Sequence, residues 1–201
     1  MLSSALEDTL RLFGKERFRP MQRELVECAL EGRSCIGILP TGSGKSLCYQ
    51  IPAVLGNGLT VVVSPLIALM RDQVAGLEKL GVAAARYDST LAEEDKASLM
   101  DRLKSGGVRL LFAAPESLES PWIQRAMELV PPGLFVVDEA HCLSEWGHSF
   151  RPDYLGLPVF FRKHGFRSVM ALTATATERV CRDLAGLFGV SDECIFRAAP
   201  R

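Results

Sequence analysis

Short apolar segments alternate along the chain with longer stretches in which apolar and polar residues recur at helical spacing. The apolar segments are rich in β-branched residues and predict strands buried on both faces, over residues 35–39, 59–64, 82–87, 108–113, 134–138 and 168–173. The stretches between them predict helices over residues 46–55, 66–80, 91–104, 116–130 and 177–188. This alternation predicts an α/β fold, a doubly wound and mainly parallel sheet with helices on both faces.

The size of the chain favours one domain. With 201 residues, of which 48% are hydrophobic, it can bury one full core, and we expect a single unit over residues 1–201.

Ligands of doubly wound parallel sheets bind beyond the carboxyl ends of the strands. We therefore expect the functional residues just after Leu39, Val63, Ala113, Val137 and Leu172.

Charge and cysteine usage narrow the class of protein. The formal net charge is −1, with 23 Lys and Arg against 24 Asp and Glu, so any contact with nucleic acid must be local. The six cysteines form no Cys-x-x-Cys pair and are expected to be buried thiols in a reducing compartment. Neither a signal peptide nor an apolar run near the ~18 residues of a membrane span is visible, so we expect a soluble, cytoplasmic protein without a membrane partner.

Residues 39–46, with the sequence LPTGSGKS, carry the strongest chemical signal. Two glycines let the loop after the first strand curl so that its backbone N–H groups face one anion, and a helix N-terminus follows. Lys45 would reach the β- and γ-phosphates of a nucleotide, and the Ser46 hydroxyl would ligate Mg²⁺. Leu39 stands where the strict pattern has glycine, and a flexible Gly/Ser turn is the alternative. The predicted nucleotide-binding residues of this loop are Thr41, Gly42, Ser43, Gly44, Lys45 and Ser46.

A pair of acids follows the predicted strand 134–138. In P-loop NTPases the first such acid holds Mg²⁺ and the second can polarise the water that attacks the γ-phosphate. Asp138 is therefore predicted to bind the metal and Glu139 to act as the base. By itself the pair is also compatible with acids that cap a helix, but the phosphate loop upstream favours a nucleotide site for ATP and Mg²⁺.

The segment 138–152, DEAHCLSEWGHSFRP, resembles the ATPase motif and the adjoining aromatic-rich loop of the RecQ family of DNA helicases, within the DExH branch of superfamily 2. The family usually has Gln at the position of Glu145 and Asp at that of Ser149. This resemblance covers almost the whole chain and adds His141 to the predicted catalytic residues. It implies that the fold is the first RecA-like lobe of a motor, and that a second RecA-like lobe lies outside this chain.

Further segments resemble family motifs. Segment 13–22, FGKERFRPMQ, is similar to the one that recognises adenine, which implies nucleotide contacts from Arg19 and Gln22 within a helical region 1–32; Lys15 stands where an aromatic residue is common. A motor on single-stranded DNA needs stacking surfaces and phosphate contacts that do not depend on the base sequence. Together with the resemblance, this need predicts a set of DNA-binding and coupling residues. They are Ser64, Asp72, Gln73, Trp146, His148, Phe150, Arg151, Thr173 and Thr175.

The implied function is an ATP-dependent DNA helicase of repair or recombination that moves 3′ to 5′ on single-stranded DNA and at duplex junctions. A eukaryotic member would be nuclear and a bacterial one associated with the nucleoid, and we expect a monomer. Because the second lobe supplies an arginine finger worth roughly 10³ to 10⁵ in rate, the lobe alone is expected to be nearly inactive.

Several alternatives remain open from the residues alone. A P-loop phosphotransferase would need an arginine-rich lid, which is not visible, and a binding module without hydrolysis would not need Lys45, Ser46, Asp138 and Glu139 together. Trp146 and Phe150 are alternatively core residues. A zinc site built from His141, Cys142 and His148 lacks a fourth ligand at recognisable spacing.

Overall fold

A parallel sheet runs through the chain in the structure, a computed structural model that describes residues 2–199. Within that range the sheet has seven strands in the spatial order β3-β4-β2-β5-β6-β1-β7, and every neighbouring pair is parallel. The strands are β1 Cys35–Ile38, β2 Leu59–Val63, β3 Ala84–Tyr87, β4 Leu110–Ala113, β5 Pro132–Val137, β6 Ser168–Thr173 and β7 Ile195–Arg197. The six predicted strands are confirmed, although β3 and β4 begin two residues later than expected.

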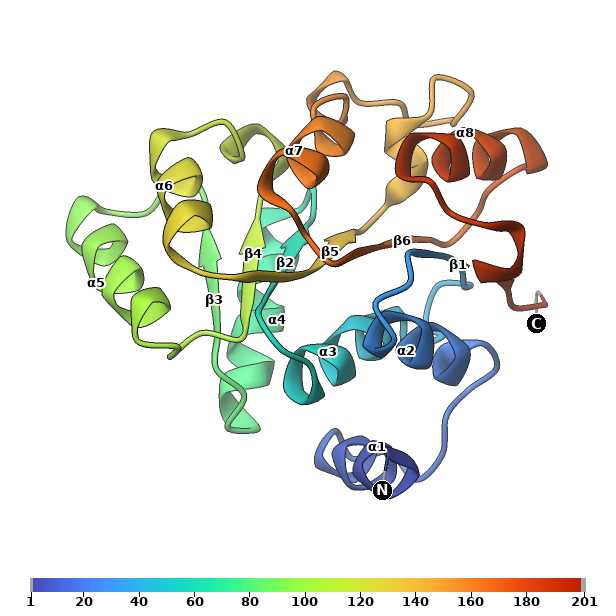
Figure 1. Cartoon of the computed structure of the whole chain (residues 1–201), viewed down its shortest axis with the longest axis horizontal. Helices are drawn as coiled ribbons and strands as arrows, with labels where there is room; N and C mark the ends of the chain where they lie inside the picture. Colours follow the sequence, from blue (N-terminus) through green and yellow to red (C-terminus); the bar gives the residue numbers. More distant parts are fainter. Residues whose placement is uncertain (1, 200–201) are drawn as a thin grey trace.

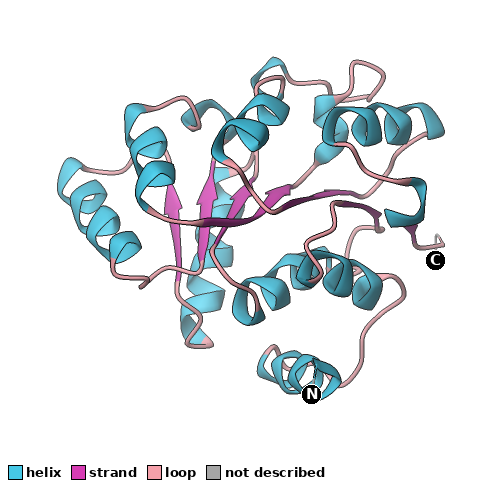
Figure 2. Ribbon diagram, in the orientation of Figure 1, coloured by secondary structure: helices cyan, strands magenta, loops and turns pink. Residues whose placement is uncertain are grey.

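Helices cover both faces of this sheet, as predicted. They are α1 Leu2–Leu12, α2 Gln22–Leu30, α3 Lys45–Leu55, α4 Ile67–Lys79, α5 Glu93–Lys104, α6 Pro121–Leu129, α7 Leu157–His164 and α8 Glu178–Phe188. Helices α2, α3 and α4 lie on one face, whereas α5, α6, α7 and α8 lie on the other (Figures 1 and 2). Helix α1 packs on α3 rather than on the sheet.

One expected helix has a different extent in the structure, and two further elements were not expected. The predicted helix 116–130 is interrupted, because a 3₁₀ turn at Pro115–Ser117 precedes α6, whose start is capped by the Ser120 hydroxyl accepting from the backbone N–H of Ile123 at 3.2 Å. Helix α7 was not predicted; its Pro158 lies in the first turn, where proline is tolerated. Strand β7, an edge strand of three residues, is too short to leave a pattern.

The order of the strands creates a switch point at the carboxyl edge of the sheet. Strand β1 leads into α3 on one face, while its neighbour β6 leads into α8 on the other face. The loops after adjacent strands therefore diverge and leave a crevice between them. The loop after β5 reaches the same edge, because β5 lies on the other side of β6.

The main core lies on both faces of the sheet and includes all six cysteines as buried free thiols, as predicted. A smaller apolar cluster joins α1 to α2 and α3. None of the helices within residues 2–199 is long and apolar enough to cross a lipid bilayer.

Phe135 anchors the face of the sheet beneath α7. Its side chain has no exposed surface, and its ring centroid lies 5.7 Å from that of Phe160 and 5.0 Å from that of Phe166. We expect Phe135→Ala to lower the free energy of unfolding by about 3–5 kcal/mol, because it removes buried apolar surface and leaves a cavity. Urea denaturation measures this loss. The control Val159→Ala, at a side chain 60% exposed, is expected to change stability by less than about 0.5 kcal/mol; equal losses in the two variants would contradict the assignment.

Candidate functional site

The loop between β1 and α3 has the backbone that the sequence predicts for an anion cradle. Gly42 and Gly44 have φ angles of 75° and 84°, a region that favours glycine, and α3 begins directly afterwards at Lys45. The ammonium of Lys45 donates a long hydrogen bond of 3.4 Å to the carbonyl oxygen of Leu39 at the base of the loop. The loop, the helix N-terminus and the lysine thus converge where phosphates would bind.

The two residues predicted to recognise adenine hold this loop in shape. Gln22, only 1% exposed, donates from Nε2 to the carbonyl oxygens of Ser43 at 2.9 Å and Gly44 at 3.0 Å. Its Oε1 accepts from the backbone N–H of Arg19 at 2.8 Å, and the Arg19 guanidinium donates to the carbonyl of Gly42. A Cβ atom at Gly44 would lie 2.7 Å from the Gln22 amide. The amide of Gln22 is therefore engaged with the loop, and its contact with the base stays a prediction.

Asp138 and Glu139 follow β5 at the same edge. The Asp138 carboxylate accepts from the backbone N–H of Glu139 at 3.0 Å, while the Tyr154 hydroxyl donates to the carbonyl oxygen of Asp138 at 3.0 Å. Burial, together with the negative charge of Glu139, raises the pKa of Asp138 to about 6, and the positive charge of Lys45 acts in the opposite direction. The phosphate loop follows β1 and the acid pair follows β5, two strands away in a parallel sheet, so both lie at the same carboxyl edge.

His141 connects the acid pair to β6. Its Nδ1 lies 2.8 Å from the Thr173 hydroxyl oxygen and 3.4 Å from a carboxylate oxygen of Glu139. The Thr173 hydroxyl donates its proton to the carbonyl of Thr175 at 3.0 Å, so it accepts from His141, whose Nδ1 carries a proton. Burial is the main cause that lowers the pKa of His141, and the ring is therefore neutral at pH 7.

The predicted aromatic loop begins beside this link. His148 is stacked on His141 with ring centroids 4.8 Å apart, and both line a cavity of about 310 Å³ together with Trp146 and Thr175. Phe150 is half-buried, whereas Arg151 is exposed and donates from its backbone N–H to the carbonyl of Cys142 at 2.8 Å. These residues thus surround the end of β6 and the acid pair.

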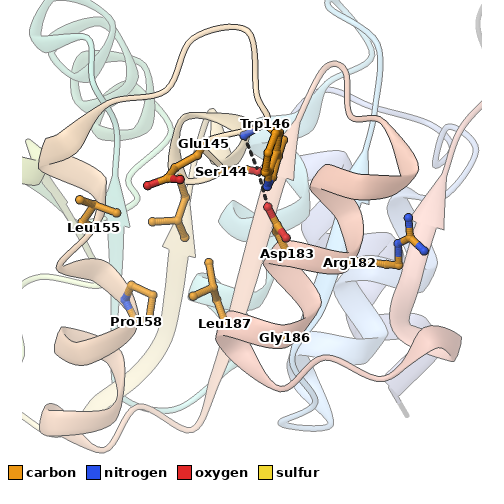
Figure 3. A pocket seen from close by; sticks show the side chains of 10 residues that line it. Ser144, Glu145, Trp146, Leu155, Pro158, Arg182, Asp183, Gly186 and Leu187 are labelled. Carbon is orange, nitrogen blue, oxygen red and sulfur yellow. Dashed lines mark hydrogen bonds between the residues drawn. The ribbon is translucent and has the colours of Figure 1, made fainter.

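Trp146 stands on the surface. It is 55% exposed, and the guanidinium carbon of Arg179 lies 3.1 Å from the centroid of its ring. Its backbone N–H donates to the hydroxyl oxygen of Ser144 at 3.3 Å. The same Ser144 hydroxyl donates to the Asp183 carboxylate at 2.7 Å (Figure 3). Trp146 and Leu187 also line a cavity of about 420 Å³ between this loop, α7 and α8. The alternative that Trp146 is a core residue is therefore wrong.

The residues predicted at the end of β2 and on α4 lie in different environments. Ser64 is 3% exposed, and its hydroxyl has no hydrogen-bond partner among the described residues. Asp72 is exposed and borders a cavity of about 260 Å³. Gln73, which the resemblance assigns to the DNA side, donates to the Ser46 hydroxyl at 3.2 Å, and its role toward DNA stays a prediction.

Sequence reasoning missed several residues that hold the site in place. Tyr154 supports Asp138, Arg179 packs on Trp146, and Asp183 ties the aromatic loop to α8. Arg179 and Asp183 are far from their partners in the sequence, so no spacing rule indicates them. Tyr154 lies two residues after segment 138–152, yet only the fold shows that it turns back to the strand end.

The arrangement fits a magnesium-bound nucleotide. The Ser43 hydroxyl, in the loop itself, is buried without a hydrogen-bond partner among residues 2–199, and Ser46 and Asp138 offer the oxygen ligands that Mg²⁺ prefers. Within the same range no three His, Cys, Asp or Glu side chains are arranged as a metal site. Mg²⁺ commonly uses only one or two carboxylates and the phosphates of the substrate, so the donors present suffice.

Comparisons with known proteins agree with this geometry. The family model described as DEAD/DEAH box helicase matches residues 19–184. The chain is 42% identical to the probable ATP-dependent DNA helicase RecS of Bacillus subtilis strain 168, over 90% of this chain and 37% of that protein. It is also 42% identical to the ATP-dependent DNA helicase RecQ of the same organism, over 96% of this chain and 33% of that protein. The chain thus spans about a third of the length of these curated relatives.

Solved structures support the fold. A hypothetical ATP-dependent RNA helicase from Sulfolobus tokodaii superposes with a TM-score of 0.70 at 19% identity, over 97% of this chain and 57% of that chain. The DUF1998 helicase MrfA, solved bound to DNA and AMPPNP, superposes with a TM-score of 0.69 at 18% identity, over 98% of this chain and 29% of that chain. At these identities the likeness establishes a RecA-like helicase fold.

The raised pKa of Asp138 predicts a pH-dependent stability. Unfolded aspartate titrates near about 3.9, so the folded value of about 6 favours the protonated form. The contribution of this carboxyl group to stability is therefore complete below the unfolded pKa and is lost as pH rises through about 6. The Asp138→Asn variant cannot ionise at this position. With a metal chelator present, its free energy of unfolding should exceed that of the wild type by about 1–3 kcal/mol at about pH 8, and this difference should disappear near about pH 4.

Urea denaturation across this pH range provides the measurement. Asp153→Asn, at an exposed side chain, is the matched control and should show no such pH-dependent gain. A gain at Asp138→Asn that does not change with pH would contradict the buried carboxylate.

Proposed function

The chain belongs to the DEAD/DEAH box helicase family, and on this basis we propose that it is the first motor lobe of a RecQ-type DNA helicase. This lobe binds Mg-ATP and single-stranded DNA and, joined to a second RecA-like lobe, couples ATP hydrolysis to 3′–5′ strand separation. The observation that carries the proposal is that the phosphate loop, Asp138 and the His141–Thr173 link lie together at the carboxyl ends of β1, β5 and β6, which are neighbours in the sheet. The names of the RecS and RecQ relatives support DNA as the nucleic acid.

Within this proposal each residue of the nucleotide side has a physical task. The loop N–H groups and Lys45 bind the triphosphate, and Ser46 and Asp138 hold the magnesium ion. When bound, that ion neutralises charge that develops on the β- and γ-phosphates. Glu139 accepts a proton from the attacking water, and the His141 ring, whose Nδ1 lies 3.4 Å from its carboxylate, packs beside it.

The same histidine supplies a route to the DNA side. Glu139 contacts His141, which contacts Thr173, and Thr173 in turn binds the carbonyl of Thr175. His148 is stacked on the other side of the ring, two residues from the exposed Trp146. A displacement of the aromatic loop by DNA thus reaches the hydrolytic base through contacts that already exist in the lobe.

One surface of the lobe suits DNA contacts that do not depend on sequence. Trp146 offers an exposed ring for base stacking, and the nearby Arg179 adds positive charge. The hydroxyl of Ser64, just before α4, has no partner among residues 2–199 but is buried, so it can donate to a backbone phosphate only when the start of α4 moves to expose it. Single strands and duplex junctions present both stacked bases and phosphates, and they are the partners we propose.

Substitution of Lys45 tests the proposed motor. In the full-length protein we expect ATPase activity that single-stranded DNA stimulates, and Lys45→Ala should lower it by at least about 100-fold, because a charge that stabilises the transition state is lost. A phosphate-release assay with and without DNA measures this. The control Lys79→Ala removes an exposed lysine at the end of α4 and should keep wild-type rates. Activity that ignores DNA but follows a small acceptor would favour a phosphotransferase, and nucleotide binding without turnover would favour a binding module.

Substitution of Trp146 tests the DNA surface. Loss of a stacking aromatic costs about 1–3 kcal/mol per base, so Trp146→Ala should raise the DNA concentration for half-maximal ATPase stimulation by about 5- to 150-fold. A titration with single-stranded oligonucleotides gives this concentration. Leu155→Ala removes another exposed apolar side chain on the far rim of the same cavity, and it should respond as wild type. The stacking role fails if both variants shift equally.

A further inference from the structure

Gln73 lies on α4 but reaches across to α3 and the phosphate loop. Its Nε2 donates to the Ser46 hydroxyl oxygen at 3.2 Å, and its Oε1 accepts from the Nε2 of Gln50 at 2.8 Å. Ser46 is the residue that follows Lys45 in the first turn of α3, and Gln50 lies one turn further along the same helix. One amide on α4 therefore connects two positions of α3.

The Gln73 amide is engaged at both ends. Its carbonyl oxygen accepts from the amide of Gln50, which is 8% exposed, and its amide nitrogen, which can only donate, faces Ser46. The contact with Gln50 and the contact with Ser46 are thus coupled, because one rigid group makes both.

This contact sets the direction of the Ser46 hydroxyl. A hydroxyl has one proton and two lone pairs. One lone pair accepts from the Gln73 amide, so the proton and the second lone pair of the hydroxyl point in other directions. Among the described residues this arrangement leaves the second lone pair of Ser46 for a cation.

We propose that Gln73 is a positioning residue that aims the metal-ligating lone pair of Ser46, rather than a DNA contact. The inference rests on the proposed function, because it assumes that Ser46 ligates the magnesium ion of a bound nucleotide. Gln73 itself does not touch the ion or the nucleotide. Partners of this kind, one step removed from the metal, typically account for 10- to 100-fold in metal affinity.

The test compares nucleotide affinity with and without magnesium. A fluorescent ATP analogue is titrated into the wild-type chain and into Gln73→Leu, once with magnesium chloride and once with chelator. In the wild type, magnesium should increase the affinity for the nucleotide. In Gln73→Leu this magnesium-dependent increase in affinity, which we call the magnesium gain, should be about 10-fold smaller, while the affinity measured in chelator should be unchanged. Thermal unfolding of each variant verifies that it is folded.

Three further variants make the result specific. Gln50→Leu, which frees the Gln73 amide to rotate, should lose part of the gain. Gln124→Leu is the matched control, because Gln124 also donates a side-chain hydrogen bond, at 2.9 Å to Leu118, but on α6 across the sheet; it should keep the full gain. In a double-mutant cycle, Gln73→Leu should add nothing to Ser46→Ala, since both act on the same ligand.

The possible outcomes separate the inference from the function on which it rests. A full magnesium gain in folded Gln73→Leu would overturn the positioning role, and so would an equal loss of affinity with and without magnesium. A wild-type chain that shows no magnesium-dependent nucleotide binding would instead overturn the proposed function, and the inference with it.

Discussion

The width of one strand sets the geometry on which the site depends. Strand β6 lies between β1, which ends at the phosphate loop, and β5, which ends at Asp138. Neighbouring strands are about 4.8 Å apart, so the loop and the acid pair are separated by roughly 10 Å. That spacing admits a triphosphate and its ion between lysine and carboxylate. It also places Thr173, at the end of β6, in contact with His141, between the phosphate loop and the acid pair.

Side-chain amides stabilise the loop and helix around this gap. A loop with two residues at positive φ has no regular backbone ladder to hold it, and Gln22 provides two hydrogen bonds to its carbonyl groups instead. Gln73 and Gln50 fix the hydroxyl of Ser46 in the same way from the other side. An amide can donate and accept at once, so it joins backbone and hydroxyl groups without adding charge next to a site built for an anion.

The sequence predicts the fold well because its six longer strands are buried on both faces and carry continuous apolar runs. It does not predict helix α7, which has a proline in its first turn, or strand β7, which has only three residues. For the site, the loop and the acid pair follow from local motifs. The partners of those motifs do not, because contacts such as Asp183 to Ser144 or Gln73 to Ser46 join segments 39 and 27 residues apart, and only the packing of helices brings them together.

The electrostatics of the site explain why a cation is needed to complete it. Burial opposes the ionised form of Asp138 and also the charged form of His141, so both groups tend toward neutrality without a ligand. A cation between Ser46 and Asp138 would restore the carboxylate, because an opposite charge nearby favours ionisation. The neutral imidazole of His141 meanwhile donates its Nδ1 proton to Thr173 and lies 3.4 Å from the carboxylate of Glu139. Binding of the magnesium-bound nucleotide would thus ionise Asp138 at the end of β5. The contact between His141 and Thr173 would stay in place and connect the acid pair to the end of β6.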